Sequence, residues 1–487
     1  MRPANDTTTG DCCERHYFAL LAVVLGLAAL NLAFRLEREV VTEWDEALYA
    51  ISAAETLRTG HWVAVTFRGT LDYYNTKPPL NVWLIALAFR VFGVNLVSLR
   101  LFSAMCAWST VAVVALWARR CFGAAVSLLA GLVLSTSFGF VYVHAGRSAN
   151  TDALYTLLVS LTVLVLWAAD HRQWRLVWLG PLLASAFLLR GMAVLMMLAL
   201  VGANEFRIGR RGREWRPRAI ALVLFLIPTL TWIFARWQLD RWQFLERLFN
   251  YDFLARSLTV IEGHPGGPLY YARILVKHQY EWIAAAAIAL LLFPPAWSRI
   301  VGALSSWREH RLATTMIGGW AIVTVGIPTL MLTKLPWYLN PFYPVFAILI
   351  ASALAHGLFQ TTSERRGGWR RLALGCAVLI AFGIAEGKLQ WYSTRYRPVG
   401  RTVQGLVISQ RHRLKGGRVY RDHWDHAEYF VTRDVAAADP QVAADVAKFL
   451  SVSRPRDYWV SSQPIADDAR LGLVESNGEE WLYERHP

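Results

Sequence analysis

Residues 17–36 read YFALLAVVLGLAALNLAFRL, a run in which Asn31 and Arg35 are the only polar side chains. A helix of about 20 apolar residues can cross the roughly 30 Å hydrocarbon core of a membrane. The run is long for the apolar region of a secretory signal peptide, and no small-residue cleavage site follows it. We therefore expect a first span that stays in the protein.

Apolar runs of similar length recur over the first 390 residues, whereas the last ninety or so are polar and mixed. The pattern predicts an all-α polytopic membrane domain over residues 1–390, with about 11 transmembrane helices and additional juxtamembrane helices. The expected spans are 17–36, 98–118, 122–143, 153–169, 176–189, 191–203, 219–237, 281–298, 313–332, 338–358 and 370–388.

Composition supports this class of protein: 55% of the 487 residues are hydrophobic and 17% are charged. The net charge of +15 comes largely from Arg residues in short segments between apolar runs. Because cytoplasmic loops carry an excess of Lys and Arg, the basic balance indicates membrane topology rather than nucleic-acid binding. The five cysteines lie outside the large polar regions, which argues against a disulfide framework. Cys12 and Cys13 precede the first span as an ordinary or a lipidated thiol pair.

The basic connectors also predict which segments share a side. They alternate correctly only if the 14 residues Pro79 to Phe92 form an interfacial helix instead of a span. The N-terminus is then cytoplasmic, and the first loop (37–97 with its juxtamembrane helices) lies outside with the tail. The basic connectors are Arg119–Arg120, Arg172–Arg175, Arg207–Arg218, Arg299–Arg311 and Arg365–Arg371.

Residues 391–487 are expected to form a small extracytoplasmic α/β domain. The pattern predicts helices over Arg401–Arg411 and Gln441–Leu450. It predicts short strands over Arg418–Tyr420, Tyr458–Ser461 and Leu471–Glu475.

Acidic residues open the first outer loop, in the sequence Glu43-Trp44-Asp45-Glu46. A carboxylate in a wet cavity at a membrane surface can act as a base or a metal ligand. A merely solvated acidic loop is the competing interpretation. The residues after Asp45 have the pattern of an amphipathic helix lying along the membrane.

Three cations are expected on the same outer side: Lys77, Arg256 and Lys334. Lys77 precedes two prolines, which favour an extended backbone and place its ammonium at headgroup level, suited to a phosphate. A snorkelling interfacial Lys is the alternative. A positive cluster outside opposes the usual inside bias, so a lipid-linked phosphate would give it a reason.

Asp152 opens a span and is predicted on the outer side with Asp45; a plain helix N-cap is the alternative. The cluster His423-Trp424-Asp425-His426 in the tail has metal-binding residue types but is more typical of a surface. No Gly-rich phosphate loop, HExxH motif or CxxC pair occurs. The pattern requires no cofactor, although it is compatible with a divalent metal.

Four motifs together resemble the polytopic polyprenyl-phosphate-sugar glycosyltransferases, which include the lipid A aminoarabinose transferases and the protein O-mannosyltransferases. The motifs are Trp44 to Ala50, Lys77 to Leu80, Arg147 to Asp152 and Lys334 to Tyr338, in the family's order and spacing over most of residues 15–360. The resemblance implies a multi-pass protein of the bacterial inner membrane. It implies transfer of a sugar from a polyprenyl-phosphate donor to an extracytoplasmic lipid, glycan or protein acceptor, usually with inversion.

By this resemblance, Asp45, Glu46 and Asp152 occupy the positions of catalytic acids. A hydroxyl acceptor needs a general base, for which Asp45 is the first choice, whereas a phosphate acceptor needs only its orienting charge. Leu48 departs from the Arg that aminoarabinose transferases often carry there. The other residues implied are the donor-phosphate contacts Lys77, Arg256, Lys334, Tyr74 and Tyr338, and the acceptor or sugar contacts Tyr49 and Arg147.

A transporter or flippase for a lipid-linked sugar is the main alternative. Transporters place ionisable residues near the bilayer midplane, often on broken helices. Here the expected spans are nearly free of charge and the acids lie in loops. The pattern therefore favours the enzyme.

Overall fold

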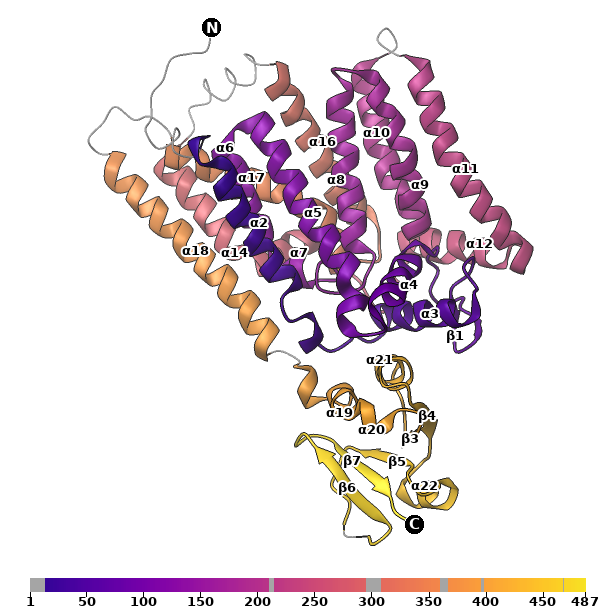
Figure 1. Cartoon of the computed structure of the whole chain (residues 1–487). Helices are drawn as coiled ribbons and strands as arrows, with labels where there is room; N and C mark the ends of the chain where they lie inside the picture. The colour runs from indigo at the N-terminus through magenta and orange to yellow at the C-terminus, as the bar shows by residue number, and fades with distance from the viewer. Residues whose placement is uncertain (1–13, 210–213, 295–307, 360–366, 396–397, 467) are drawn as a thin grey trace.

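The computed structural model describes residues 14–209, 214–294, 308–359, 367–395, 398–466 and 468–487. Figure 1 shows a bundle of long helices with a small C-terminal unit beneath one end. The Cys12–Cys13 pair lies outside the described residues. The long helices are α2 (Tyr17–Ala33), α5 (Leu96–Phe122), α8 (Asp152–Ala169), α11 (Trp215–Asp240), α14 (Tyr270–Leu292), α16 (Arg308–Leu330), α17 (Tyr343–Phe359) and α18 (Gly367–Arg395).

In the described part of the chain, nine helical stretches are long and apolar enough to cross a membrane. One of them, Gln173–Ile208, begins with the short helix η2 (Gln173–Trp178). It continues as two arms, α9 (Leu179–Arg190) and α10 (Val194–Ile208), which meet at η3 (Gly191–Ala193). Counting the arms separately and adding the shorter apolar helix α6 (Ala124–Ser135) reaches the eleven segments expected. The protein is thus a multi-pass membrane protein, as predicted.

Some predicted boundaries are wrong. The single span expected over 122–143 is two helices, α6 and the short α7 (Phe138–Tyr142), which break at Thr136 and Ser137. Helix α14 begins eleven residues before the expected 281, and α18 continues to Arg395. At the predicted boundaries, residues 281 and 388, the two helices are joined by an ion pair: Glu281 of α14 pairs with Lys388 of α18 at 2.8 Å. The ion pair offsets the cost of burying each charge alone.

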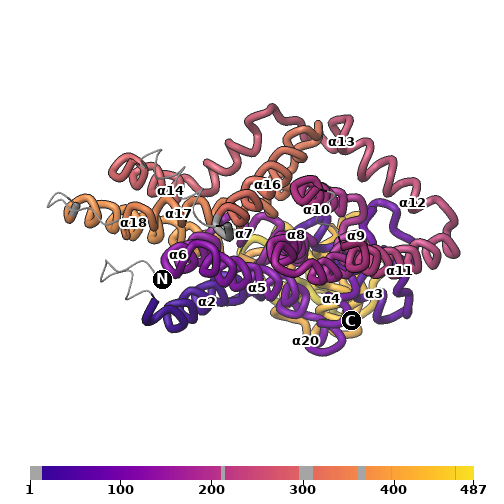
Figure 2. The backbone as a smooth tube through the Cα atoms, turned by 90° about the horizontal axis from the view of Figure 1, so that it is seen from above, coloured from indigo at the N-terminus to yellow at the C-terminus, as the bar shows by residue number. Residues whose placement is uncertain are grey.

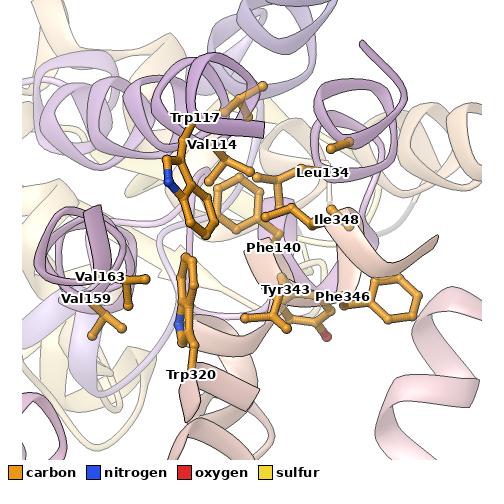
Figure 3. Close-up of a cluster of buried hydrophobic side chains, with 14 of the residues drawn as sticks. Val114, Trp117, Leu134, Phe140, Val159, Val163, Trp320, Tyr343, Phe346 and Ile348 are labelled. Atoms are coloured by element: carbon orange, nitrogen blue, oxygen red, sulfur yellow. The ribbon is translucent and has the colours of Figure 1, made fainter. Parts of the chain in front are cut away.

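Aromatic and branched side chains fill the centre of the bundle. Figure 3 shows Trp117 and Trp320 facing each other, with Phe140 and Ile348 beside them. The ring centroids of the two tryptophans are 6.4 Å apart, and Trp320 donates its indole N–H to the Pro341 carbonyl at 2.9 Å. Large apolar side chains also remain exposed on outer helices such as α11, in keeping with a lipid-facing surface. Figure 2, seen from above, shows the helices spread as an elongated array.

Two short helices lie across the lower end of the bundle in Figure 1: α3 (Asp45–Thr59) and α4 (Leu80–Phe92). The amphipathic helix predicted after Asp45 and the helix predicted over Pro79–Phe92 are therefore present. A small antiparallel hairpin, β1 (Thr66–Phe67) and β2 (Thr70–Leu71), connects them. The outer loop thus forms a folded layer between the bundle and the C-terminal unit.

The C-terminal unit contains a five-stranded sheet in the order β4-β3-β5-β7-β6, with β3 parallel to β4 and β5. The helix predicted over Gln441–Leu450 begins only at Val446, because Gln441 pairs with Tyr420 in the sheet. Strand β7 and helix α21 were not predicted. The elements are β3 (Arg418–Arg421), β4 (Asp439–Val442), β5 (Tyr458–Ser461), β6 (Leu471–Ser476), β7 (Trp481–Arg485), α19 (Val403–Ser409), α20 (Arg411–Leu414), α21 (His426–Phe430) and α22 (Val446–Val452).

Candidate functional site

A cavity of about 160 Å³ opens between the outer loop, α8, the tip of α9 and α10, and the segment that follows α11. Cationic, phenolic and apolar side chains all line it. The polar group comprises Lys77, Tyr155, Arg190, Asp252 and Tyr338. The apolar group includes Met192, Leu195, Met196, Ile327 and Met331. Such a cavity suits an amphiphile with an anionic head.

Two cations share one carboxylate in this cavity. Lys77 Nζ lies 2.5 Å from Asp252 Oδ1, and Arg256 Nε lies 3.2 Å from the same oxygen. Arg256 also pairs with Glu262 at 2.9 Å through Nη2. Among the described residues, its buried Nε makes no hydrogen bond of acceptable geometry. The guanidinium is thus held between the carboxylates of Asp252 and Glu262, behind the residues that line the cavity.

The segment after α11 places these groups. It forms α12 (Gln243–Arg247), the π-helix η4 (Leu248–Ala255) and α13 (Arg256–Leu258). A π-helix is rare and often marks a functional site. The amides of Leu332 and Thr333 donate to the carbonyls of Ser257 and Arg256 at 3.0 and 3.3 Å, which joins this segment to the turn after α16.

Arg190 is a third cation at the cavity, and it is not among the site residues predicted from the sequence. Its Nη1 lies 2.6 Å from Asp152 Oδ1, and its guanidinium lies over the Tyr155 ring at 5.2 Å. The tight turn that follows it needs Gly191, which has φ +55°. A Cβ there would approach Leu248 Cδ1 to 2.7 Å, so only glycine fits without movement. The turn thereby brings the end of α9 against the start of α8.

Asp45, the first residue of α3, has a side chain that is 49% exposed. Its Oδ2 lies 3.9 Å from His144 Nδ1, and the His144 ring stacks on Trp337 at 3.7 Å. The preceding residue, Trp44, has φ +67° and ψ −112°, a conformation that costs a non-glycine residue about 1–3 kcal/mol. An exposed carboxylate beside this strained turn is free to meet a substrate.

Tyr49 shows how closely the acids and cations gather. It lies one turn after Asp45 on the buried face of α3. Burial and the charge of Asp45 raise the pKa of Tyr49, while Arg190 opposes the rise and Asp152 and Asp252 add to it. The charges of all four side chains therefore reach this one phenol.

Two more predicted tyrosines lie at the same place. Tyr338 lines the cavity from η5 (Pro336–Phe342), the short helix that directly precedes α17. Tyr74 is 49% exposed, with its ring 5.6 Å from that of Trp44. Burial and the charges of Glu262 and Asp45 raise the pKa of Tyr74, so it stays a neutral hydroxyl donor.

Three predicted residues lie in buried networks instead. Glu46 is fully buried, with Oε1 2.7 Å from Arg100 Nε, and it accepts further bonds from the amides of Thr42 and Ala149. Burial alone would raise the pKa of Glu46, but Arg100 and these amides hold it below its ordinary value. A carboxylate enclosed in this way orders the start of α3.

Arg147 and Lys334 are likewise buried and bonded to other groups of the protein. Arg147 pairs with Glu39 at 2.7 Å and donates to the carbonyls of Asn31 and Phe34, both at 2.9 Å. The Lys334 ammonium donates to carbonyls at the end of α16, including that of Pro328 at 3.1 Å. Neither cation faces the cavity in this structure.

The tail cluster His423 to His426 contacts the outer loop. His426 is hydrogen-bonded through its ring and its amide to Glu43, which also accepts from the amide of Ala427. In the described part of the chain, no three His, Cys, Asp or Glu side chains converge as a metal site would require.

The fold and the site define a multi-pass membrane protein with a cavity lined by cationic and apolar side chains, and comparison with known proteins agrees with this class. The family model described as dolichyl-phosphate-mannose-protein mannosyltransferase matches residues 76–236. The resemblance to the polytopic polyprenyl-phosphate-sugar glycosyltransferases that the motifs indicate is confirmed by this match and by the relatives below.

Two curated relatives carry the name undecaprenyl phosphate-alpha-4-amino-4-deoxy-L-arabinose arabinosyl transferase. The protein from Pseudomonas fluorescens Pf-5 is 29% identical over 374 residues, 74% of this chain and 61% of the relative. The one from Pseudomonas savastanoi pv. phaseolicola is 30% identical over 344 residues, 69% of this chain and 61% of the relative. The alignments thus span less than two thirds of these relatives' length.

Solved structures confirm the fold. ArnT from Cupriavidus metallidurans, crystallised with undecaprenyl phosphate, superposes with a TM-score of 0.66 at 18% identity and covers 96% of this chain and 97% of its own. An oligosaccharyltransferase from Archaeoglobus fulgidus reaches 0.57 at 12% identity, with 92% and 69% covered. The C-terminal unit therefore belongs to the shared fold, since ArnT is matched over almost its whole length.

Proposed function

We propose that this protein is an integral membrane glycosyltransferase that takes a sugar from a polyprenyl-phosphate donor. The observation that carries the proposal is the cavity lined by Lys77, Arg190 and Tyr338 together with apolar side chains of α10 and α16. The donor phosphate would lie against the cations while its isoprenoid tail follows the apolar wall. Cations placed where charge develops stabilise a departing phosphate.

Asp45 is the group proposed to act on the acceptor. Its exposed carboxylate can remove a proton from a hydroxyl acceptor as the oxygen attacks the anomeric carbon. The C–O bond to the polyprenyl phosphate then breaks, and the phosphate leaves with both electrons. Attack opposite the leaving group would invert the anomeric carbon. For a phosphate acceptor, Asp45 would orient the nucleophile and stabilise positive charge on the sugar.

Asp152, Glu46 and Arg147 are proposed to position other groups. Asp152 holds the Arg190 guanidinium at 2.6 Å, toward the cavity. Glu46 and Arg147 hold the start of the outer loop in place. Glu46 does so through its ion pair with Arg100, and Arg147 through its ion pair with Glu39. The ammonium of Lys334 is bound to carbonyls, so Lys334 would act indirectly. It would do so by ordering the turn after α16, whose Thr333 amide is bonded to the Arg256 carbonyl.

The relatives' name points to a particular donor, undecaprenyl phosphate carrying 4-amino-4-deoxy-L-arabinose. We propose this amino pentose as the first donor to test and an envelope glycolipid such as lipid A as the first acceptor, with glycans and proteins as alternatives. Leu48, at a position where aminoarabinose transferases often carry Arg, is the residue that separates this chain from that substrate assignment.

The site is proposed to face the outside of the bacterial inner membrane. The basic pairs Arg119–Arg120 and Arg172–Arg175 lie at the ends of α5 and α8 that are opposite the C-terminal unit (Figure 1). Positive connectors favour the cytoplasm, so the N-terminus would lie inside and the C-terminal unit in the periplasm. A lipid carrier flipped to that side would deliver the sugar.

A carrier for lipid-linked sugars is the competing function. The Glu281–Lys388 pair is a buried ionisable pair of the kind found in transport paths. Its charges neutralise each other and join α14 to α18, so it favours helix packing over transport. The enzyme remains the better account of an exposed Asp45 beside the cavity.

The test compares membranes of cells that make the native protein or Asp45→Asn. Native protein should add one sugar mass to an envelope lipid or glycan in intact-mass spectra. Asp45→Asn should abolish the addition while leaving expression and binding of polyprenyl phosphate unchanged. The same substitution at Asp468, a partly exposed acid in the C-terminal unit that pairs with Arg470, serves as control. A fully active Asp45→Asn variant would remove Asp45 from the mechanism.

A further inference from the structure

A short extended segment, residues 39–43, joins the C-terminal unit to the bundle just before Asp45. We call it the strap. Its odd-numbered residues contact the C-terminal unit. Glu39 forms a β-bridge with Pro398, and the backbone of Val41 exchanges two hydrogen bonds with the Gln404 side chain, at 2.8 and 3.0 Å. Glu43 accepts the hydrogen bonds from helix α21.

The strap also contacts the bundle. The Val40 carbonyl accepts from Arg100 Nη2 at 2.7 Å, and the Thr42 amide donates to Glu46 at 2.8 Å. Glu39 joins both sides, because Arg147 pairs with its carboxylate and Arg100 donates to its carbonyl, so the segment is held by the bundle and the C-terminal unit at once. Three successive odd positions bonded to the C-terminal unit make this docking specific.

The strap ends at the strained residue Trp44. Its φ of +67° with ψ −112° is a backbone conformation essentially reserved for glycine. Such a conformation persists only where the surroundings impose it. The surroundings here are Glu43 on one side and the first turn of α3 on the other, and the Trp44 ring rests 5.0 Å from the His426 ring. The direction in which Asp45 leaves this turn depends on that conformation.

We propose that the C-terminal unit completes the active site: through His426 and Glu43 it holds Trp44 in its strained conformation and so aims the carboxylate of Asp45. His426 is therefore a positioning residue. The inference rests on the proposed role of Asp45 and deepens it, because it makes a unit distant in sequence a requirement for the chemical step.

Substitutions at the contact should slow chemistry without weakening donor binding. His426→Gln and Glu43→Gln should each lower kcat by about 10- to 100-fold, the scale on which a misplacement of about 1 Å slows an oriented reaction. The KM for the donor should stay unchanged, because Lys77, Arg190 and Arg256 come from other segments. A change in donor KM with kcat intact would overturn the proposal.

Asp434→Asn is the matched control. Asp434 of the C-terminal unit pairs with Arg58 near the far end of α3, so this substitution weakens docking without touching the strap. It should leave kcat unchanged. An equal loss of kcat in Asp434→Asn and His426→Gln would show that docking in general, and not the aim of Asp45, is what matters, and would overturn the proposal.

Trp44→Gly provides a rescue test. Glycine adopts the conformation of residue 44 without strain, so the turn should depend less on the contact that imposes it. The loss caused by His426→Gln should therefore be much smaller in a Trp44→Gly background than with Trp44 present. A Trp44→Ala background removes the indole but keeps the strained backbone, so it separates relief of strain from loss of the ring contact with His426. Equal losses in both backgrounds would contradict the proposal.

Hydrogen exchange tests the strap without any activity. In the full-length protein in detergent, His426→Gln should speed amide exchange in a peptide covering residues 40–46, whereas Asp434→Asn should not. Unchanged exchange in His426→Gln would overturn the proposal even if sugar transfer is observed. If the native protein transfers no sugar, the proposed function fails, while exchange still decides whether the contact holds the strap.

Discussion

Arg190 illustrates what a single side chain contributes at the tip of an apolar hairpin. It is nearly buried, pairs with Asp152 and lies over the Tyr155 ring. A buried guanidinium with one carboxylate partner keeps donors for a further anion. In the sequence it is one Arg between two short apolar runs, which indicates a turn and nothing more. Its partner is 38 residues away, and only the packing of α8 against α9 brings them together.

Lys77 gives the most direct residue-scale prediction. Lys77→Met keeps the length and apolar stem of the side chain but removes the ammonium that faces the cavity. We expect donor KM to rise by about tenfold or more, the scale of one charge-assisted hydrogen bond of roughly 1.5–3 kcal/mol. Acceptor KM should change little. Steady-state kinetics with varied donor and acceptor measure both.

Lys415→Met, at an exposed position in the C-terminal unit, is the matched control and should change neither constant. If Lys77→Met leaves donor KM unaltered, the phosphate does not contact Lys77.

At the scale of elements, the hairpin of α9 and α10 is fitted against η4. Gly191 touches Leu248 of that π-helix, and Arg190 beside it reaches the same cavity as Asp252 on η4. Two elements that carry opposite charges into one cavity are thus held together by an apolar contact at a glycine. A substitution at Gly191 should therefore also shift the side chains that line the cavity.

Gly191→Ala should destabilise the protein by about 1–3 kcal/mol, because alanine meets both the strained φ of +55° and the Leu248 side chain. Thermal unfolding of the purified protein in detergent measures the change. Gly202→Ala on α10 is the control, since a Cβ there meets nothing within 4 Å and the helix should gain about 0.5–1 kcal/mol. An equal response of the two variants would argue against the fit of the hairpin.

Helix α21 carries a carboxylate that should respond to pH. Burial raises the pKa of Glu428 from 4.5 to about 7, although Arg421 opposes the rise. An acid whose folded pKa is raised contributes stability below its unfolded value and loses it as pH rises through about 7. The thermal midpoint of the C-terminal unit should therefore fall between pH 4.5 and 7.

Glu428→Gln should flatten that fall, because the amide cannot ionise. The exposed Glu479→Gln should leave it unchanged. Asp434, whose pKa burial raises to about 6, adds a fall of the same sign and should remain in both variants. A native-like slope in Glu428→Gln would assign the effect to other groups.

The elements show how far the sequence reaches. Long apolar runs such as α2 and α5 were predictable, because membrane spans are recognised from length and hydropathy alone. The break between α6 and α7 was not, since Thr136 and Ser137 satisfy their hydroxyls within the helix and carry no breaking signal. Strand β7 was missed because its pairing with β5 and β6 is a tertiary property.

Some residues of the candidate site could likewise be predicted from the sequence, and others could not. Asp45, Lys77 and Arg256 could be proposed because charge on the outer side of a membrane protein is unusual and the motifs resemble a known family. Arg190 and Asp252 could not, because their importance comes from contacts across the cavity. Whether a charged residue faces the cavity or a buried network, as for Lys334, also depends on packing.

At the scale of the whole molecule, the two ends of the bundle differ. Helices α3 and α4 and the C-terminal unit gather at one end of the bundle, whereas the last turn of α5, which carries Arg119 and Arg120, lies at the other end (Figure 1). The positive-inside rule gives this polarity a direction across the membrane. A donor carried on a lipid must then be presented on the side of the C-terminal unit.

A reporter fused after the last residue tests that direction. Alkaline phosphatase, which is active only in the periplasm, should be active in the fusion, and a cytoplasmic reporter at the same point should be silent. The same reporters fused after Arg207, in a basic connector, should give the reverse pattern. A cytoplasmic C-terminus would place the cavity on the wrong side for the proposed donor.

The carboxylate shared by Lys77 and Arg256 has a kinetic consequence. Asp252 acts as an internal counter-ion, so under the proposed function an incoming lipid phosphate would exchange with it instead of meeting uncompensated charge. After sugar transfer, the product phosphate would occupy the same cations, and Asp252 would compete to reclaim them. We expect this competition to speed the departure of the spent carrier, so that the residue opposing binding is also the one that sustains turnover.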